Sequence, residues 1–327
     1  MASEKIRIGI VGWGNLGRGV KQAVVHNRDM QLVGVFTRRD PKEIKAARTP
    51  VYSADDLPRF RKKIDVLLLC GGSATDLPQQ GPKMAGLFNS VCSYDTHAKI
   101  PAYFKKVDAA ARKGRNLALI STGWDPGLFS LARLLGQSVL PNGKDYTFWG
   151  RGVSQGHSDA IRRVPGVAVG VQYTVPNLEA VEAVRSGRNP ELSTREKHKR
   201  VCYVVAKPDA DRAAIEKAIV EMPNYFADYD TEVNFVTQEE LKRDHSGLPH
   251  GGFVLRSATT AGGPSHLLEF RLQLGSNPEF TASTMVAYAR AVHRMRKEGR
   301  TGALTVFDVP FGQLSPLPPE KLRKQLL

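Results

Sequence analysis

The sequence has 327 residues, of which 41% are hydrophobic and 24% are charged, and its formal net charge is +15. This balance is typical of a soluble globular protein long enough for two lobes, and no run approaches the roughly 18 to 20 apolar residues of a membrane helix. The few, widely spaced cysteines (Cys70, Cys92 and Cys202) argue against a disulfide framework and against a zinc site. Because no signal-peptide pattern precedes the first predicted strand, we expect a cytoplasmic protein without membrane partners.

The positive charge would suit a nucleic-acid partner. The basic residues are nevertheless spread along the chain, with only short clusters at Arg59 to Lys63, Lys197 to Arg200 and Lys321 to Lys324. No helix-turn-helix or zinc-finger pattern accompanies them. We therefore expect no nucleic-acid binding, and a basic surface that aids solubility and attracts anionic ligands.

In chain order, the first half alternates predicted strands with predicted helices. The opening unit is a strand over Ile6 to Val11, a helix over Leu16 to Val25 and a strand over Gln31 to Phe36. Three more strands follow, over Ile64 to Cys70, Ser90 to Tyr94 and Leu117 to Ser121. The alternation predicts an α/β fold with a Rossmann-type doubly wound parallel sheet, in which ligands bind at the carboxyl ends of the strands.

A glycine motif joins the first strand to the first helix. Its residues are Gly12, Trp13, Gly14, Asn15, Leu16 and Gly17. In this position Gly12 allows a tight turn, Gly14 lets the backbone approach a pyrophosphate, and Gly17 lets the helix pack closely on the strand. The free N–H groups of the helix N-terminus attract the phosphates, so the motif predicts a dinucleotide site. Glycines of an ordinary turn explain this spacing poorly.

The end of the second strand selects the dinucleotide. NAD sites usually carry an acidic residue there, whereas this chain has Thr37, Arg38 and Arg39, whose guanidinium groups match a ribose phosphate. We therefore expect NADP as the cofactor. The alternative is that both arginines are solvated and that Asp40 binds the ribose. The loop after the third predicted strand is expected to line the same site, through Cys70, Gly71, Gly72 and Ser73.

The segment from 126 to 279 has a different pattern. Its predicted strands lie over Val171 to Val175, Val201 to Ala206 and Thr231 to Val236, with a helix over Ala213 to Glu221. These elements predict an α+β lobe with a mostly antiparallel sheet. A later helix over Ser283 to Lys297 and a strand-like stretch over Gly302 to Val309 return to the first lobe. We expect residues 1–125, completed by about 280–327, to bind NADP, and residues 126–279 to form the substrate and partner lobe.

Two acidic residues follow predicted strands of the first lobe, Asp95 after one and Asp125 after the next. At the carboxyl edge of the sheet, beside a dinucleotide site, a pair of acids suits a cationic substrate. Charge-assisted hydrogen bonds to an amine would orient its carbon towards the nicotinamide. Each acid taken alone could instead be a turn former or a helix cap.

Several longer motifs, taken together and in this order, resemble meso-diaminopimelate dehydrogenase. The resemblance runs from about Ile6 to Pro310. The motifs are the glycine motif, Ser121-Thr122-Gly123-Trp124-Asp125-Pro126-Gly127, Phe148-Trp149-Gly150, Ser154-Gln155-Gly156-His157-Ser158-Asp159 and Pro249-His250-Gly251-Gly252. The resemblance implies an NADP-dependent, reversible oxidative deamination at the D-centre of meso-2,6-diaminopimelate, in lysine and cell-wall precursor synthesis, by a homodimer with a substrate-binding and dimerisation domain.

The resemblance also implies roles for single residues. Asp95 and Asp125 would hold the reacting amine as catalytic residues, and Trp124 and Trp149 would wall the pocket. Residues of the substrate loop and anchors for the distal L-amino acid end would complete the site, namely Gln155, Gly156, Thr174, Arg200, His250 and Asn277. Such anchors let the enzyme choose between two nearly identical ends of the substrate.

Some of these residues have a plainer interpretation, whereas His250, between Pro249 and Gly251, is more typical of a functional loop. The run Lys197 to Arg200 is typical of a solvated charged surface, and Thr174 of an ordinary strand threonine. Trp124 could belong to the core, and Asn277 before a proline could form a turn. His157 is a weak candidate for a catalytic base.

Two positions depart from the family pattern. Cys92 lies where relatives often have an acid, and Arg151 replaces a proline common after the Trp149-Gly150 pair. Substrate breadth is therefore open, and a D-amino acid dehydrogenase of broader specificity is one alternative. Another Rossmann-type NADP oxidoreductase is less well supported. The expected nucleotide-binding segment 1–125 contains no Lys-Pro pair like that of sugar oxidoreductases, and the glycine- and histidine-rich loop of dihydrodipicolinate reductases is not found.

Overall fold

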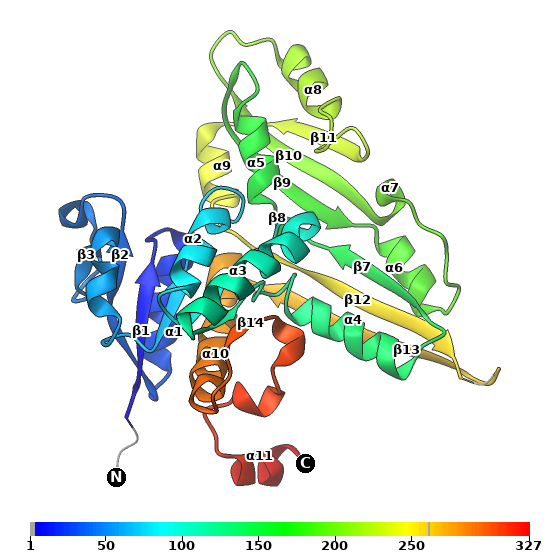
Figure 1. The fold of residues 1–327 in the computed structure, drawn as a ribbon. Helices are drawn as coiled ribbons and strands as arrows, with labels where there is room; N and C mark the ends of the chain where they lie inside the picture. Colours follow the sequence, from blue (N-terminus) through cyan, green and yellow to red (C-terminus); the bar gives the residue numbers. More distant parts are fainter. Residues whose placement is uncertain (1–3, 261) are drawn as a thin grey trace. The chain divides into compact units, whose positions relative to one another are not determined.

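The computed structural model describes residues 4–260 and 262–327 (Figure 1). These residues form two compact units. Unit 1 contains the chain up to Leu131 together with Pro278–Leu327, and unit 2 contains Ala132–Asn277. Unit 2 is thus an insertion in the sequence of unit 1. No helix in the described ranges is both long enough and apolar enough to cross a membrane.

Unit 1 is built on a seven-stranded sheet in the order β14-β6-β5-β4-β1-β2-β3. All neighbouring strands are parallel. The strands are β1 (Ile6–Val11), β2 (Met30–Thr37), β3 (Val51–Ser53), β4 (Val66–Leu69), β5 (Ser90–Cys92), β6 (Leu117–Leu119) and β14 (Gly302–Leu304). From β1, the chain adds β2 and β3 on one side and then β4, β5, β6 and β14 on the other. The predicted doubly wound sheet is thereby confirmed.

Helices cover both faces of this sheet. Its main helices are α1 (Asn15–His26), α2 (Leu77–Ala85), α3 (Ile100–Gly114) and α10 (Asn277–Lys297). One apolar core contains residues of α1 and α10, such as Val20 and Met285, and the other contains residues of α2 and α3, such as Met84 and Val107. Short elements complete the unit, namely 3-10 helices at Pro41–Glu43, Ala54–Phe60, His97–Lys99, Val306–Asp308 and Phe311–Gln313, and α11 (Pro319–Leu326).

Unit 2 contains two sheets, of strand order β11-β10-β9-β8 and β13-β12-β7. Among the described residues of unit 2, β10 and β11 pair in parallel and the other pairs are antiparallel. The expected α+β unit is thereby confirmed. The strands are β7 (Lys144–Trp149), β8 (Gly152–Val153), β9 (Val167–Pro176), β10 (His198–Ala206), β11 (Asp230–Phe235), β12 (His250–Thr259) and β13 (Ser265–Leu274). The helices are α5 (Gln155–Arg162), α6 (Leu178–Arg185), α7 (Thr194–Lys197), α8 (Arg212–Val220) and α9 (Gln238–Asp244), while α4 (Leu128–Val139) crosses from unit 1.

Some predicted elements differ in extent. The strand-like stretch Gly302 to Val309 stops at Leu304, because Thr305 caps a 3-10 helix through a capping box with Asp308. The helix predicted from Ser283 begins at Asn277 instead. Pro278 then occupies a first-turn position, where its missing N–H costs nothing and its fixed φ suits a helix.

Arg290 ties α10 to the segment that precedes β2. Its guanidinium group is 2% exposed and donates to both carboxylate oxygens of Asp29, at 2.6 and 2.8 Å. It also donates to Asn27 Oδ1 at 2.6 Å and to the Leu314 carbonyl at 2.7 Å. The hydrogen bond from Arg290 is the main cause that holds the pKa of Asp29 below its usual value.

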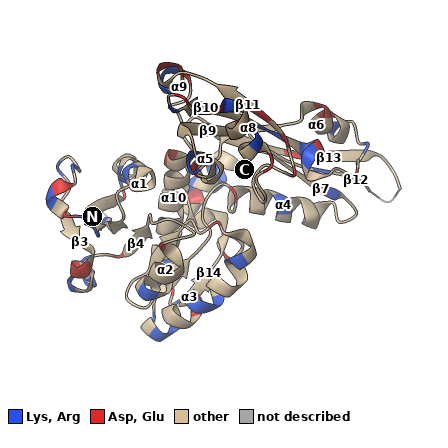
Figure 2. Cartoon of the chain, turned by 90° about the horizontal axis from the view of Figure 1, so that it is seen from above, with Lys and Arg blue, Asp and Glu red and all other residues tan. Residues whose placement is uncertain are grey.

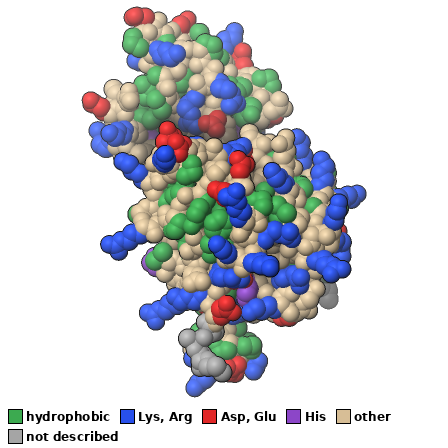
Figure 3. Space-filling model, turned by 60° about the vertical axis from the view of Figure 1, so that its left-hand side comes forward, with side chains coloured by type: hydrophobic (Ala, Val, Ile, Leu, Met, Phe, Trp, Pro, Cys, Tyr) green, Lys and Arg blue, Asp and Glu red, His purple; other side chains and the backbone are tan. Residues whose placement is uncertain are grey.

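Lysine and arginine side chains lie on elements of both units (Figure 2). The face in Figure 3 carries many of them, interspersed with hydrophobic and uncharged groups. This distribution follows the spread of basic residues along the sequence.

Candidate active site

The turn between β1 and α1 forms a cradle for an anionic group. Gly12 has a φ of 97°, which favours glycine, and a Cβ there would lie 3.2 Å from the Cys70 carbonyl oxygen. A Cβ at Gly17 would lie 2.2 Å from the Gly12 carbonyl oxygen, so only glycine lets α1 pack this closely. Gly14 is the N-cap of α1 and gives no side-chain cap, which leaves the first N–H groups of the helix for a ligand.

A cavity of about 290 Å³ adjoins this cradle. It is lined by nine of the residues predicted to bind the cofactor, namely Gly12, Trp13, Gly14, Thr37, Arg38, Arg39, Cys70, Gly71 and Gly72. Four other predicted residues do not line it. Leu16 packs against the core, Gly17 packs on Gly12, Asn15 accepts from Arg18, and Ser73 accepts from the Asp95 N–H.

The two arginines at the end of β2 are held differently. Arg38 is 74% exposed and its Nη2 lies 2.7 Å from Asp76 Oδ1, while Arg39 Nη2 donates to the Trp13 carbonyl at 2.9 Å. Asp76 also accepts from the Gly72 N–H at 2.8 Å, so one carboxylate joins Arg38 to the glycine loop after β4. Asp40 accepts from the Lys42 N–H and caps a 3-10 helix.

The groups around this cavity are chemically suited to the phosphates of a dinucleotide. It combines uncapped helix N–H groups with two guanidinium groups, and Gln80, which also lines it, has a buried Oε1 without a hydrogen-bond partner. Sequence reasoning missed Asp76 and Gln80, since neither belongs to the glycine motif.

Asp95 and Asp125 follow the neighbouring strands β5 and β6 of unit 1. The loops that carry them are linked, because Thr122 donates to the Cys92 carbonyl through its N–H at 3.1 Å and its hydroxyl at 2.7 Å. Asp95 is exposed and Asp125 is half-buried. Trp124 is 8% exposed and packs edge-on against Phe129, with ring centroids 5.3 Å apart.

In unit 2, Arg200 and Thr174 are cross-strand partners on β10 and β9. Arg200 Nη1 donates to Thr174 Oγ1, and Arg200 is only 7% exposed. Burial lowers the pKa of the Arg200 guanidinium. The interpretation of Arg200 as part of a solvated charged run is therefore wrong, because strand alternation turns it inward while Lys199 faces solvent.

Trp149 is supported by a histidine that sequence reasoning missed. The backbone N–H of Trp149 donates to His198 Nε2 at 2.8 Å. The two rings stack, with their centroids 5.3 Å apart. Trp149 is 39% exposed, whereas His198 is 2% exposed. Burial, and then the nearby Arg200 charge, lower the pKa of His198 to about 3, so its imidazole stays neutral and can accept this hydrogen bond. His198 and Arg200 share one face of β10.

The predicted substrate loop forms the start of α5. Gln155 and Gly156 are exposed, and a Cβ at Gly156 would meet nothing within 4 Å. His157 Nδ1 lies 2.8 Å from Oγ of the N-cap residue Ser154, and its ring packs edge-on against Phe226. Burial, and then Arg200, lower the pKa of His157 to about 4, so it is uncharged at neutral pH.

His250 is the first residue of β12, and Asn277 is the first residue of α10. The His250 ring packs on Gly152, where a Cβ would lie 2.4 Å from it, and the Asn277 N–H donates to the Leu248 carbonyl at 2.8 Å. Gly152 is in turn the cross-strand partner of Thr174. Unit 2 therefore links His250, through Gly152, to the Thr174–Arg200 pair.

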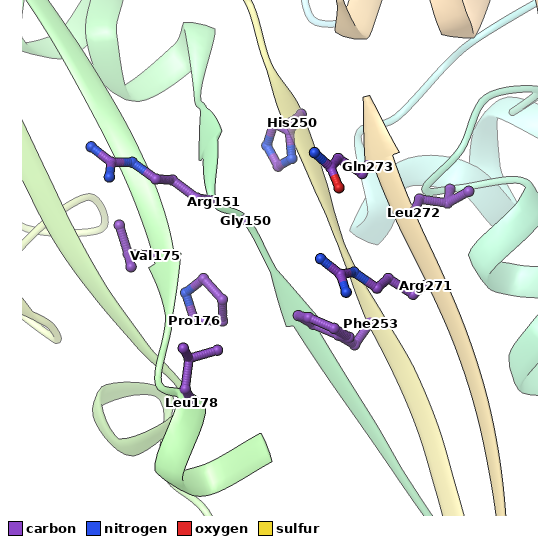
Figure 4. A pocket seen from close by; sticks show the side chains of 10 residues that line it. All are labelled: Gly150, Arg151, Val175, Pro176, Leu178, His250, Phe253, Arg271, Leu272 and Gln273. Atoms are coloured by element: carbon purple, nitrogen blue, oxygen red, sulfur yellow. The ribbon is translucent and has the colours of Figure 1, made fainter. Parts of the chain in front are cut away.

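A second cavity, of about 380 Å³, lies beside His250 (Figure 4). Its lining includes Arg151, Val175 and Arg271. Within the described part of the chain, neither Thr174 nor Arg200 lines this cavity. Arg151, the departure from the family pattern, lies with its guanidinium 5.2 Å from the Tyr173 ring centroid.

Comparisons with known proteins decide the family. Residues 123–276 match the model of the diaminopimelic acid dehydrogenase C-terminal domain. The meso-diaminopimelate D-dehydrogenase of Ureibacillus thermosphaericus is 61% identical over 99% of this chain and 100% of its own length. The chain belongs to the meso-diaminopimelate D-dehydrogenase family. The resemblance seen in the sequence motifs is thereby confirmed.

Solved structures agree with this family assignment. Corynebacterium glutamicum DAP dehydrogenase in complex with DAP has a TM-score of 0.92 and 45% identity, and the match covers 99% of each chain. An engineered D-amino acid dehydrogenase bound to NADP+ has a TM-score of 0.87 and 43% identity, and the match covers 99% of this chain and 100% of that one. The two-unit α/β architecture is thus that of the meso-diaminopimelate D-dehydrogenase family.

Proposed function

We propose that the protein catalyses the reversible, NADP-dependent oxidative deamination of meso-2,6-diaminopimelate at its D-centre. The products are L-2-amino-6-oxopimelate, which cyclises to tetrahydrodipicolinate, and ammonia. The observation that carries the proposal is the 61% identity to a meso-diaminopimelate D-dehydrogenase over nearly the whole chain. The reaction belongs to lysine and diaminopimelate biosynthesis.

Unit 1 would hold the cofactor. The N–H groups of the α1 N-terminus would receive the pyrophosphate, and Arg38 and Arg39 the ribose phosphate that distinguishes NADP from NAD. When bound, NADP+ supplies a hydride acceptor. The related engineered D-amino acid dehydrogenase bound to NADP+ supports this choice.

Asp95 and Asp125 would bind the reacting ammonium group. Their loops are linked through Thr122 and the Cys92 carbonyl, which fixes the two strand ends together. The substrate carbon loses a hydride and its nitrogen loses a proton; water then adds to the resulting imine and ammonia leaves. A carboxylate near the amine can accept the proton, and Trp124 and Trp149 would exclude bulk water from the reacting carbon.

Unit 2 would bind the distal L-amino acid end. Arg200, Thr174, His250 and Asn277 offer donors and acceptors for its carboxylate and amine, and Gln155 and Gly156 complete the substrate loop. An arginine fork matches a carboxylate in two hydrogen bonds, which gives orientation as well as affinity. This distal recognition would select one end of the meso substrate.

Unit 2 would also form a homodimer. Helix α4 exposes Leu134, Leu135 and Val139, at 42%, 56% and 54%, while Gly136 packs against Arg256 of β12. Exposed apolar side chains on one helix suit a self-association surface.

The free thiols of Cys70, Cys92 and Cys202 suit the reducing cytoplasm.

The test follows NADP+ reduction at alkaline pH with meso-, LL- and DD-diaminopimelate and simple D-amino acids, with NAD+ as the control cofactor. The proposal expects activity with the meso isomer and NADP+. Activity on simple D-amino acids would indicate a broader D-amino acid dehydrogenase, and no activity on any amine would refute the proposal.

A further inference from the structure

Arg200 is a buried cation without an acidic partner in the described part of the chain. It is 7% exposed, and none of the salt bridges in residues 4–260 and 262–327 includes it. Removing a charged group from water is costly unless another group compensates. Some other feature of unit 2 must therefore stabilise the guanidinium group.

That feature is the ring of Tyr229. Arg200 Cζ lies 3.8 Å from the Tyr229 ring centroid, well within the range of a cation–π contact. Tyr229 is half-buried and immediately precedes β11, and its N–H donates at 2.9 Å to the carbonyl of Phe226, which is fully buried. The Tyr229 backbone is thus held in a turn beside a core residue of unit 2.

A ring and a carboxylate stabilise a guanidinium group in different ways. A carboxylate binds the N–H donors that lie in the guanidinium plane, whereas an aromatic ring contacts the face and leaves those donors free. One donor of Arg200, on Nη1, is used by Thr174 Oγ1, and Arg200 Nε is buried without a hydrogen-bond partner. Donors therefore remain for an incoming carboxylate.

We propose that Tyr229 is a positioning residue that supports Arg200 from its face and so keeps its in-plane donors for the distal carboxylate of the substrate. This inference rests on the proposed function and names a specificity determinant that the sequence motifs do not include. An acidic residue in place of the ring would neutralise Arg200 and occupy the same donors. An aliphatic residue would leave the buried cation unsupported.

The experiment compares Y229L and Y229F, with R200M and the double variant R200M/Y229L. A desolvated cation–π contact is worth about 2 kcal/mol, which is about 30-fold in affinity. We expect Y229L to lower kcat/KM for meso-diaminopimelate about 30-fold, mainly through KM, and Y229F to stay within about threefold of the wild type. If Tyr229 acts through Arg200, the Tyr229→Leu change has an effect of less than about threefold in the R200M background.

A ligand comparison isolates the distal carboxylate. D-lysine has the structure of meso-diaminopimelate without the carboxylate of its L-end. The difference between the calorimetric affinities for the two ligands therefore measures the contribution of that carboxylate. Y229L should weaken meso-diaminopimelate binding and leave D-lysine binding unchanged. Thermal unfolding shows whether a variant is less stable as a whole. The KM for NADP+, whose proposed site lies in unit 1, shows whether the change has disturbed parts of the protein distant from Tyr229.

Three results would overturn the role of Tyr229. These are an unchanged kcat/KM in Y229L, an equal loss in the wild-type and R200M backgrounds, and an equal loss of affinity for both ligands. A wild-type protein that binds but does not oxidise meso-diaminopimelate would refute the proposed reaction instead, and the ligand comparison would still test Tyr229.

Discussion

Replacing Arg290 with methionine should destabilise unit 1 through one buried ion pair. The side chain is 2% exposed and donates four hydrogen bonds, to Asp29, Asn27 and the Leu314 carbonyl. Methionine fills similar space but donates none of them. The Asp29 carboxylate would then lose its counter-ion in a partly buried position, with 28% of its side chain exposed.

The magnitude follows from that geometry. Removing one partner of a buried ion pair costs about 3 to 5 kcal/mol, and partial rehydration of Asp29 places R290M near the lower end. Lysine at this position keeps the charge but cannot form the two-point contact with the Asp29 carboxylate. R290K should therefore lower the free energy of unfolding by about half as much as R290M. The free energy of unfolding is measured by urea titration with circular dichroism.

The pH dependence supplies a second test. The hydrogen bond from Arg290 lowers the pKa of Asp29 in the folded state, so the pair contributes its full stability above the unfolded carboxyl pKa of about 3.9. The contribution is lost as the pH falls through the lower, folded pKa. The difference between wild type and R290M should therefore be largest near pH 7 and shrink below about pH 4. A difference under about 1 kcal/mol at pH 7, or one that does not change with acidification, would refute this reasoning.

Three further predictions concern the two candidate binding regions. R39L should raise the KM for NADP+ by about 10- to 100-fold and leave that for NAD+ unchanged, because a charge-assisted hydrogen bond to phosphate is lost; an equal effect on both cofactors would contradict this role. H198F should lower kcat/KM for meso-diaminopimelate about tenfold, because the backbone N–H of Trp149 loses its acceptor. The loss should be the same at every pH from 6 to 10, since His198 is neutral throughout this range. A wild-type rate would show that Trp149 needs no such support. G17A should lower the melting temperature and weaken NADP+ binding, because its Cβ would lie 2.2 Å from the Gly12 carbonyl oxygen. The control variant G312A should do neither, because a Cβ at Gly312 meets nothing within 4 Å.

Local patterns in the sequence were enough to predict most of unit 1. The strand over Ile6 to Val11 matches β1 residue for residue, and the glycine motif lies at its end. By contrast, the sheet of β7, β12 and β13 was not predicted. Its strand β7 ends at Trp149 and pairs with β12, which begins only at His250, so no local signal joins them.

The candidate site shows the same limit. Motifs supplied the identities of the proposed substrate ligands, yet the run Lys197 to Arg200 concealed a strand. Alternation along β10 could have revealed that His198 and Arg200 point inward while Lys199 points outward. Nothing in the sequence indicates that Tyr229 lies against Arg200 or that Asp76 pairs with Arg38, because these contacts depend on how distant segments pack.

The insertion of unit 2 into unit 1 also sets the order in which the chain can fold during synthesis. All of Ala132–Asn277 leaves the ribosome before α10 and β14, which supply part of the unit 1 core and an edge of its sheet. The amino-terminal part of unit 1 must therefore wait, with one apolar face of its sheet incompletely covered, while the inserted unit has its whole sequence available. Domains usually mature from the N-terminus onward. Here the middle of the chain can be finished first, because unit 2 is continuous in the sequence and unit 1 is not.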